Sequence, residues 1–222
     1  MLLALDTSTR TTGLALYDGE QVISETIWTS NDFHTVELAP AIVEAIQKSG
    51  KKIDKVEAVA VAIGPGSFTG LRIGLAMAKG IALARHLPII GIPSLDILAY
   101  AQPLVDLPLA AVLRAGRGRL AIDWYRAGKK GWISQNKLAV TTAEELVEQI
   151  EEPTLVAGEL DDDERHILKR KKKLIDLTSP AHSVRRPSFL AELGWRRWQA
   201  GQVDDPAALT PIYIHHHDPI PA

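Results

Sequence analysis

The sequence contains no cysteine, carries little net charge and has no long apolar run. Without cysteine, a disulfide scaffold, thiol catalysis and cysteine-ligated zinc or iron–sulfur sites are excluded. A net charge of -2 provides no general attraction to RNA or to a membrane surface. No window approaches the ~20 apolar residues of a membrane span, and Asp6 comes too early for a signal peptide. We therefore expect a globular, cytoplasmic protein.

Apolar runs and turn residues predict the same order of elements in each half of the chain. Each half reads as three meandering strands, a helix, a strand and a second helix. The predicted helices cover residues 35–48, 71–85, 94–100, 142–150, 161–168 and 188–200. This βββαβα order, repeated, predicts an α/β fold of two lobes. It resembles the actin, Hsp70 and sugar-kinase (ASKHA) superfamily. We place the boundary near Gln102 and Pro103, giving an N-terminal lobe of residues 1–102 and a C-terminal lobe of residues 103–222.

A glycine-rich stretch from Gly64 to Gly70 joins a predicted buried strand to the helix at 71–85. Glycines give the backbone freedom that a bulky side chain would block, and a loop that enters a helix N-terminus can bind an anion. The Gly-Lys-Ser/Thr ending of a Walker phosphate loop is missing. A tight turn between strand and helix is the favoured interpretation, with phosphate binding as the alternative.

The helix that follows carries two rows of small residues. One row is Gly70, Gly74, Ala78 and Ala82, and the other is Ala76, Gly80 and Ala84. Each interior glycine costs about 1 kcal/mol of helix stability relative to alanine. Close packing of another backbone would offset that cost. That backbone belongs either to the chain's own sheet or a neighbouring helix, or to a partner protein.

Several segments together resemble the TsaB (YeaZ) family. They are residues 3–9 (LALDTST), His34, residues 64–76 (GPGSFTGLRIGLA), Lys79-Gly80 and the closing segment 211–214 (PIYI). The resemblance covers roughly the first hundred residues and is most specific between Gly64 and Gly80. It departs at the first hairpin of the second half, where this chain carries Arg114, Arg117 and Arg119.

The resemblance implies a non-catalytic subunit for threonylcarbamoyl transfer to adenosine in tRNA. The partners implied are the related transferase TsaD and a small ATPase, TsaE, with tRNA reached indirectly through the complex. No catalytic residue and no metal site are implied for this chain, because Ser94 and Leu98 stand where the transferase has its metal-binding histidines. The partner-binding residues implied by the family's first-lobe helices are His34, Leu38, Ala41, Ile42, Gly70, Leu71, Gly74, Leu75, Ala78 and Lys79.

Asp6, Thr7 and Ser8 stand where kinase-like relatives contact nucleotide phosphates. No tightly bound cofactor is expected, and ATP or ADP at the interface of the complex is left open. Two other readings stay open as well. One is a stand-alone ASKHA-type ATPase or glycoprotease-like peptidase, and the other is a homodimer that uses the same helix face.

Three further clusters have ordinary explanations. His34 and Glu37 share a helix face, which suits a partner contact or helix start better than half a metal site. The run His215-His216-His217 is expected to be a flexible tail. The basic run Lys169–Lys173 could contact tRNA phosphates, but the acidic run Asp161–Glu164 precedes it and largely cancels its charge, so a solvated helix face is favoured.

Overall fold

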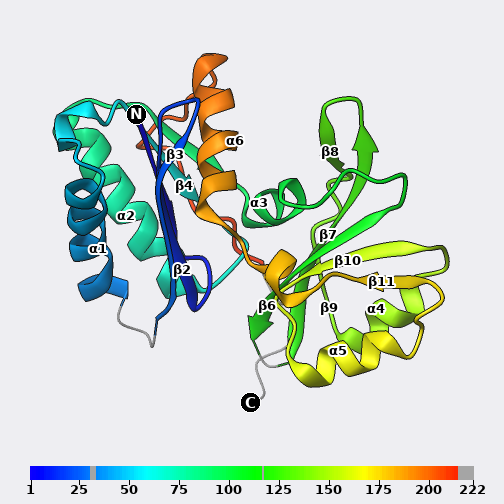
Figure 1. Ribbon diagram of the computed structural model, residues 1–222. Coiled ribbons are helices and arrows are strands. Elements are labelled where there is room, and N and C mark those ends of the chain that lie inside the picture. The colour runs from blue at the N-terminus through cyan, green and yellow to red at the C-terminus, as the bar shows by residue number, and fades with distance from the viewer. Residues whose placement is uncertain (31–33, 117, 215–222) are drawn as a thin grey trace.

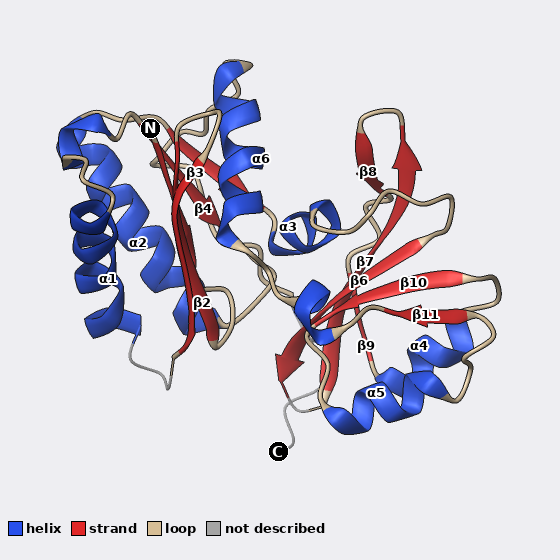
Figure 2. Cartoon of the chain, in the orientation of Figure 1, coloured by secondary structure: helices blue, strands red, loops and turns tan. Residues whose placement is uncertain are grey.

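The computed structural model describes residues 1–30, 34–116 and 118–214, with only the backbone at residues 34 and 35. The chain forms two lobes, each built on one mixed sheet with helices packed against it (Figure 1, Figure 2). Among these residues, no helix is long and apolar enough to cross a membrane.

The first sheet has the strand order β3-β2-β1-β4-β5. Its strands are β1 (Leu2–Asp6), β2 (Thr11–Tyr17), β3 (Val22–Thr29), β4 (Ala58–Ala62) and β5 (Ile89–Ile92). The pairs β1–β2 and β2–β3 are antiparallel, whereas β1–β4 and β4–β5 are parallel. Helices α1 (His34–Lys48) and α2 (Phe68–Arg85) cover one face, and the short 3-10 helix η1 (Ile53–Lys55) precedes β4.

The second sheet has the order β11-β10-β6-β7-β8, with β9 also paired to β7. Its strands are β6 (Leu109–Gly116), β7 (Arg119–Gly128), β8 (Gly131–Ser134), β9 (Ala139–Thr141), β10 (Thr154–Gly158) and β11 (Ile175–Leu177). Helices α4 (Ala143–Gln149) and α5 (Asp162–Lys169) pack on one face. Helix α3 (Ser94–Tyr100) packs on the other face through Leu95 and Leu98. Apolar residues between 132 and 140 also predict a single strand, the third of this half, but the structure has two separate strands there, β8 and β9.

The remaining helix, α6 (Pro187–Gln199), returns from the second half of the chain to the first sheet. Leu190 and Ala191 pack there on Leu2, Ala60 and Ile90. The expected division at residues 102 and 103 is therefore wrong for α6, which follows the boundary but packs on the first sheet. It is also wrong for α3, which precedes the boundary but packs on the second sheet. The physical reason is that β1 and β4 are buried along their whole length, so both faces of the sheet need a covering helix.

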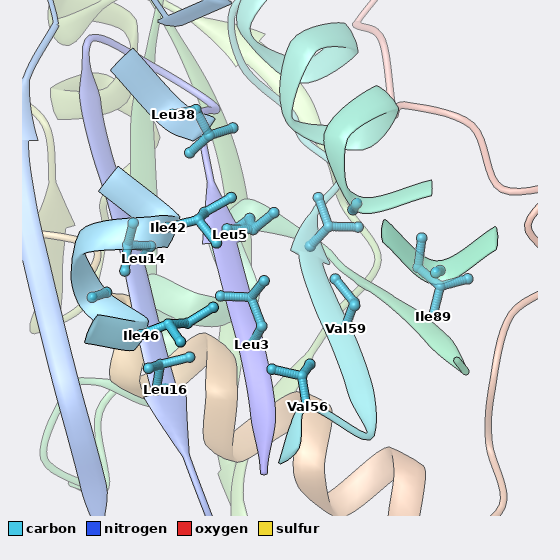
Figure 3. Close-up of a cluster of buried hydrophobic side chains, with 14 of the residues drawn as sticks. Leu3, Leu5, Leu14, Leu16, Leu38, Ile42, Ile46, Val56, Val59 and Ile89 are labelled. Carbon is cyan, nitrogen blue, oxygen red and sulfur yellow. The ribbon is translucent and has the colours of Figure 1, made fainter. Parts of the chain in front are cut away.

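The core under α1 and α2 is made of leucine, isoleucine and valine side chains from the sheet and both helices. Figure 3 shows the inward-facing members from α1 and the strands meeting in one layer, among them Leu3, Leu5, Leu38, Ile42 and Val59. Burying such side chains contributes roughly 1.5–3 kcal/mol each. This layer fixes which side of each helix faces inward.

Candidate functional site

The glycine-rich loop at residues 64–70 packs closely against the turn that follows β1. The Ser67 amide donates to the Ser8 carbonyl at 2.6 Å, and the Thr7 hydroxyl donates to the Gly70 carbonyl at 2.7 Å. A Cβ at Gly66 or Gly70 would overlap the backbone carbonyl of Ser8 or Thr7. Ser67 caps α2 by accepting from the Gly70 amide at 3.2 Å. The glycines therefore allow two backbones to approach closely, which accounts for them as a tight strand-to-helix turn.

The first row of small residues on α2 is covered by the chain itself. Gly70, Gly74, Ala78 and Ala82 are buried, and a Cβ at Gly74 would collide with the Thr7 hydroxyl. Seven of the partner-binding residues implied by the resemblance lie in this core: Leu38, Ile42, Gly70, Leu71, Gly74, Leu75 and Ala78. In this structure none of the seven is accessible to a partner, because the sheet already occupies the face that they share. Ala41 is half-buried against the same core, Lys79 is half-buried, and the His34 side chain lies outside the described residues.

The second row is exposed. Ala76, Gly80 and Ala84 line a shallow groove of about 590 Å³, bordered by apolar side chains including Ile53, Ile73, Met77 and Ile81. Among the described residues, nothing lies within 4 Å of a Cβ built at Gly80. On α1, beside α2 in Figure 1, Val36 and Val43 are exposed as well. We call the hollow over Ala76, Gly80 and Ala84 the α2 groove.

Gly70→Ala and Gly80→Ala should change stability in opposite directions. The first places a methyl group against a backbone carbonyl, so we expect the free energy of unfolding to fall by about 1–3 kcal/mol. The second fills open space and improves helix propensity, so we expect a rise of about 1 kcal/mol. Urea unfolding of both variants measures the two signs. A loss of stability in Gly80→Ala would show that the groove is not open.

A buried arginine joins the two lobes. Arg185 follows the 3-10 helix η2 (Pro180–Ser183) and is completely inaccessible to solvent. Its Nε donates to Asp6 Oδ2 at 2.9 Å, and Nη1 pairs with Glu159, which follows β10 of the second sheet. Nη2 donates to the Thr9 hydroxyl at 2.9 Å and to the Thr11 carbonyl at 3.2 Å. One guanidinium therefore holds a carboxylate from each lobe.

The electrostatic setting favours a charged arginine at this place. Burial alone lowers the pKa of Arg185, but the carboxylates of Asp6 and Glu159 outweigh that effect and raise the pKa above its usual range. No sequence signal marked Arg185, since its two carboxylate partners come from distant parts of the chain.

The three candidate nucleotide-binding residues are buried and hydrogen-bonded within the chain. Asp6 accepts from Arg185 and from the Ser8 amide, the latter at 2.8 Å. The Ser8 and Ser94 hydroxyls are 2.7 Å apart, and Ser94 also accepts from the Gly64 amide at 3.1 Å. A phosphate at this place would have to displace these bonds.

Next to this network, a cleft of about 940 Å³ opens between the lobes. Its lining includes Arg10, Phe68, Arg114, Glu159 and Arg165. Arg165 donates to the Thr178 carbonyl at 3.1 Å and to the Ser183 hydroxyl at 3.2 Å. Arginines from both lobes thus line one hollow, together with the acidic residues Glu159 and Asp162.

The other sequence candidates have structural partners. Leu98 is in the core of the second lobe, and Ser94 bridges two loops as described. Glu37 accepts from the Trp28 indole at 3.0 Å. Lys171 donates to the Val147 and Ile150 carbonyls at the end of α4, at 3.0 and 2.6 Å. The histidine run at 215–217 lies outside the described residues. Within the described part of the chain, no cluster of three acidic or histidine side chains could hold a metal ion.

Comparison with known proteins finds a matching family model, a sequence relative and a structural neighbour. The family model of TsaD, tRNA N6-adenosine threonylcarbamoyltransferase, matches residues 21–156, more than half of the chain. The tRNA threonylcarbamoyladenosine biosynthesis protein TsaB of Bacillus subtilis is 29% identical over 96% of this chain and 93% of its own length. The structure of YeaZ from Pseudomonas aeruginosa superposes with a TM-score of 0.75 at 22% identity, covering 96% of this chain and 99% of that one.

A more distant structural match places the fold in its wider class. A ROK hexokinase from Thermus thermophilus superposes with a TM-score of 0.50 at 10% identity, over 90% of this chain and 99% of that one. The two-lobed ASKHA fold expected from the order of elements is therefore confirmed. By its family model and its relatives, the chain belongs to the TsaD family and, within it, to the TsaB (YeaZ) proteins.

Proposed function

We propose that this chain is a non-catalytic, cytoplasmic subunit of the machinery that makes threonylcarbamoyladenosine in tRNA. In this proposal it binds a TsaD-like transferase through the α2 groove, and the pair recruits a TsaE-like ATPase. The observation that carries the proposal is the exposed second row of α2. The family and the names of the relatives support the pathway, and the exposed groove supports the proposed place of contact.

The groove has the properties of a helix-packing surface that lacks its partner. Gly80 weakens an exposed turn of an 18-residue helix by about 1 kcal/mol and contacts nothing in return within the described chain. Rows of residues at i, i+4 form the ridges and grooves into which a second helix packs. Because Ala76, Gly80 and Ala84 carry almost no side chain, a helix laid there could approach more closely than the usual 8–10 Å between axes. An apolar rim then excludes water from the contact.

The non-catalytic part of the proposal is supported by two features. Ser94 and Leu98 have structural roles at the positions implied for the transferase's metal ligands. Asp6, the acidic residue of the candidate phosphate-binding turn, is bound to Arg185 instead. Both features are consistent with a chain that positions another protein rather than the reacting groups.

Reconstitution tests this function. Purified TsaD-like and TsaE-like proteins, with unmodified tRNA and the threonylcarbamoyl donor, should form the modified adenosine at multiple turnover only when this chain is added. Mass spectrometry of digested tRNA measures the product. Equal product formation without the chain would contradict the proposal. ATP hydrolysis or proteolysis by the chain alone, lost in Asp6→Ala, would favour the stand-alone enzyme instead.

A further inference from the structure

An exposed aromatic ring lies at the mouth of the cleft between the lobes. Phe68 is the first residue of α2, and 54% of its surface is accessible to solvent. The Arg72 guanidinium lies 3.6 Å above its ring, and the Tyr213 ring centroid is 5.1 Å away. Arg72 Nε donates to the Tyr213 hydroxyl at 2.9 Å. These contacts hold Phe68, Arg72 and Tyr213 in one arrangement, which we call the aromatic–arginine stack.

Two more arginines adjoin this stack from different elements. Arg10, from the turn between β1 and β2, and Arg114, near the end of β6, line the same cleft as Phe68. Arg114 also lines a smaller hollow of about 230 Å³ together with Phe68 and Tyr213. Arginines from both lobes therefore line the hollows that this exposed aromatic ring borders.

The three arginines near the aromatic–arginine stack, Arg10, Arg72 and Arg114, are exposed to solvent, although Glu159 and Asp162 line the cleft as well. Behind the cleft, Arg185 pairs with Asp6 and Glu159 and offsets one of their two negative charges. Arg114 pairs with Asp161 at 3.0 Å, but both side chains are about half exposed, at 53% and 40%. Exposed pairs of this kind contribute little, so a phosphate can replace the carboxylate. Among the described residues, no carboxylate pairs with Arg72.

We propose that this surface binds RNA, with Arg10, Arg72 and Arg114 contacting phosphates and an unpaired base stacking on the exposed part of the aromatic–arginine stack. Proteins bind single-stranded RNA and RNA loops by combining aromatic or guanidinium stacking with phosphate contacts. The inference rests on the proposed function and deepens it, because it gives this subunit its own contact with the tRNA. The low net charge of the chain is no obstacle, since the contact depends on a local cluster.

Two opposite changes test the proposal. The double variant Arg72→Gln with Arg114→Gln should bind a fluorescein-labelled RNA hairpin about tenfold more weakly than the unaltered chain, with a shallower dependence on salt. Asp161→Asn should bind the hairpin several-fold more tightly, because it releases Arg114. Asp161 caps α5, and asparagine is an equally good capping residue, so this variant keeps the helix start. A gain in affinity is not the expected result of losing a folded binding site.

The matched control is Arg126→Gln, which removes an exposed arginine paired with Glu152 in the second lobe and should leave RNA affinity unchanged. Fluorescence anisotropy of the full chain, alone and in complex with the TsaD-like partner, gives each affinity. Equal RNA affinity in the unaltered chain, the double arginine variant, Asp161→Asn and Arg126→Gln would overturn the proposal. Displacement of the hairpin by AMP at the same concentration as by unlabelled RNA would overturn it in favour of a free-nucleotide site. Binding to the TsaD-like protein, measured in parallel, should stay constant in these variants, so a failure here is distinguishable from a failure of the proposed function.

Discussion

Arg185→Met should lower the free energy of unfolding by about 3–5 kcal/mol, because it leaves one buried carboxylate, Asp6, and one partly buried carboxylate, Glu159, without their cation. Asp6 would lose its 2.9 Å partner and Glu159 its ion pair, and the Thr9 hydroxyl and Thr11 carbonyl would each lose a donor. The two lobes meet at this point, so we expect their packing to loosen as well. Urea unfolding followed by tryptophan fluorescence measures the loss.

The adjacent residue provides a matched control. Arg186 also pairs with a carboxylate, Glu25, but its side chain is 53% exposed. Glu25 is only 13% exposed but keeps the Ser188 amide as a donor, so Arg186→Met should cost about 1–2 kcal/mol, less than Arg185→Met. Combining Arg185→Met with Asp6→Asn and Glu159→Gln should recover part of the lost stability, because it removes the unpaired charges. Equal losses for the two arginine variants would contradict the role given to Arg185.

Gly80→Leu should weaken binding of the TsaD-like partner by about 100-fold, equivalent to about 2.7 kcal/mol. A leucine side chain would fill the α2 groove where we place the partner's backbone. The same substitution improves helix propensity, so the free chain should be at least as stable as the unaltered protein. Isothermal titration calorimetry with the purified partner measures the affinity, and urea unfolding confirms that the variant is folded.

Ala139→Leu is the control for added bulk, because Ala139 is exposed on β9 of the other lobe. It should bind the partner with unaltered affinity. If Gly80→Leu also bound normally, the α2 groove would be excluded as the contact surface, whatever the pathway in which the chain acts.

Strands such as β1 and β4 could be predicted from the sequence because each is an apolar run bounded by turn residues, whereas the pattern does not separate β8 and β9 as two strands. The covering helices could not be assigned in the same way. The apolar periodicity of α6 shows that one side is buried, but it does not show which sheet it covers. Helix α6 covers the first sheet because β1 and β4 carry apolar side chains on both faces of that sheet. That both faces of the first sheet need a covering helix becomes clear only from the order of the strands in the sheet.

The rows of small residues on α2 show how spacing alone can mislead. Both rows repeat every four residues, so each is equally suited to close packing. The rotation of the helix decides between them, and here the first row faces the sheet. Leu71 and Leu75 indicate the inward side of the helix, because these two large apolar residues are next to Gly70 and Gly74 in the sequence. The resemblance to a family pointed to this helix, but five of the six residues that it implied there, all except Lys79, are buried.

Arg185 illustrates the part of the site that no local pattern reveals. It is 179 residues from Asp6 and 26 from Glu159 along the chain. An arginine before a helix is ordinarily a surface residue, so its burial follows only from the meeting of the two lobes.

Thiol protection on α2 tests the partner contact most directly. The chain has no cysteine, so Ala84→Cys introduces a single reactive group beside the α2 groove, and Ala139→Cys places one on the other lobe. Maleimide labelling should be fast for both in the free chain. With saturating TsaD-like partner, labelling of Ala84→Cys should slow sharply while Ala139→Cys is unaffected. Equal labelling of Ala84→Cys with and without the bound partner would contradict the claim that the partner covers this row.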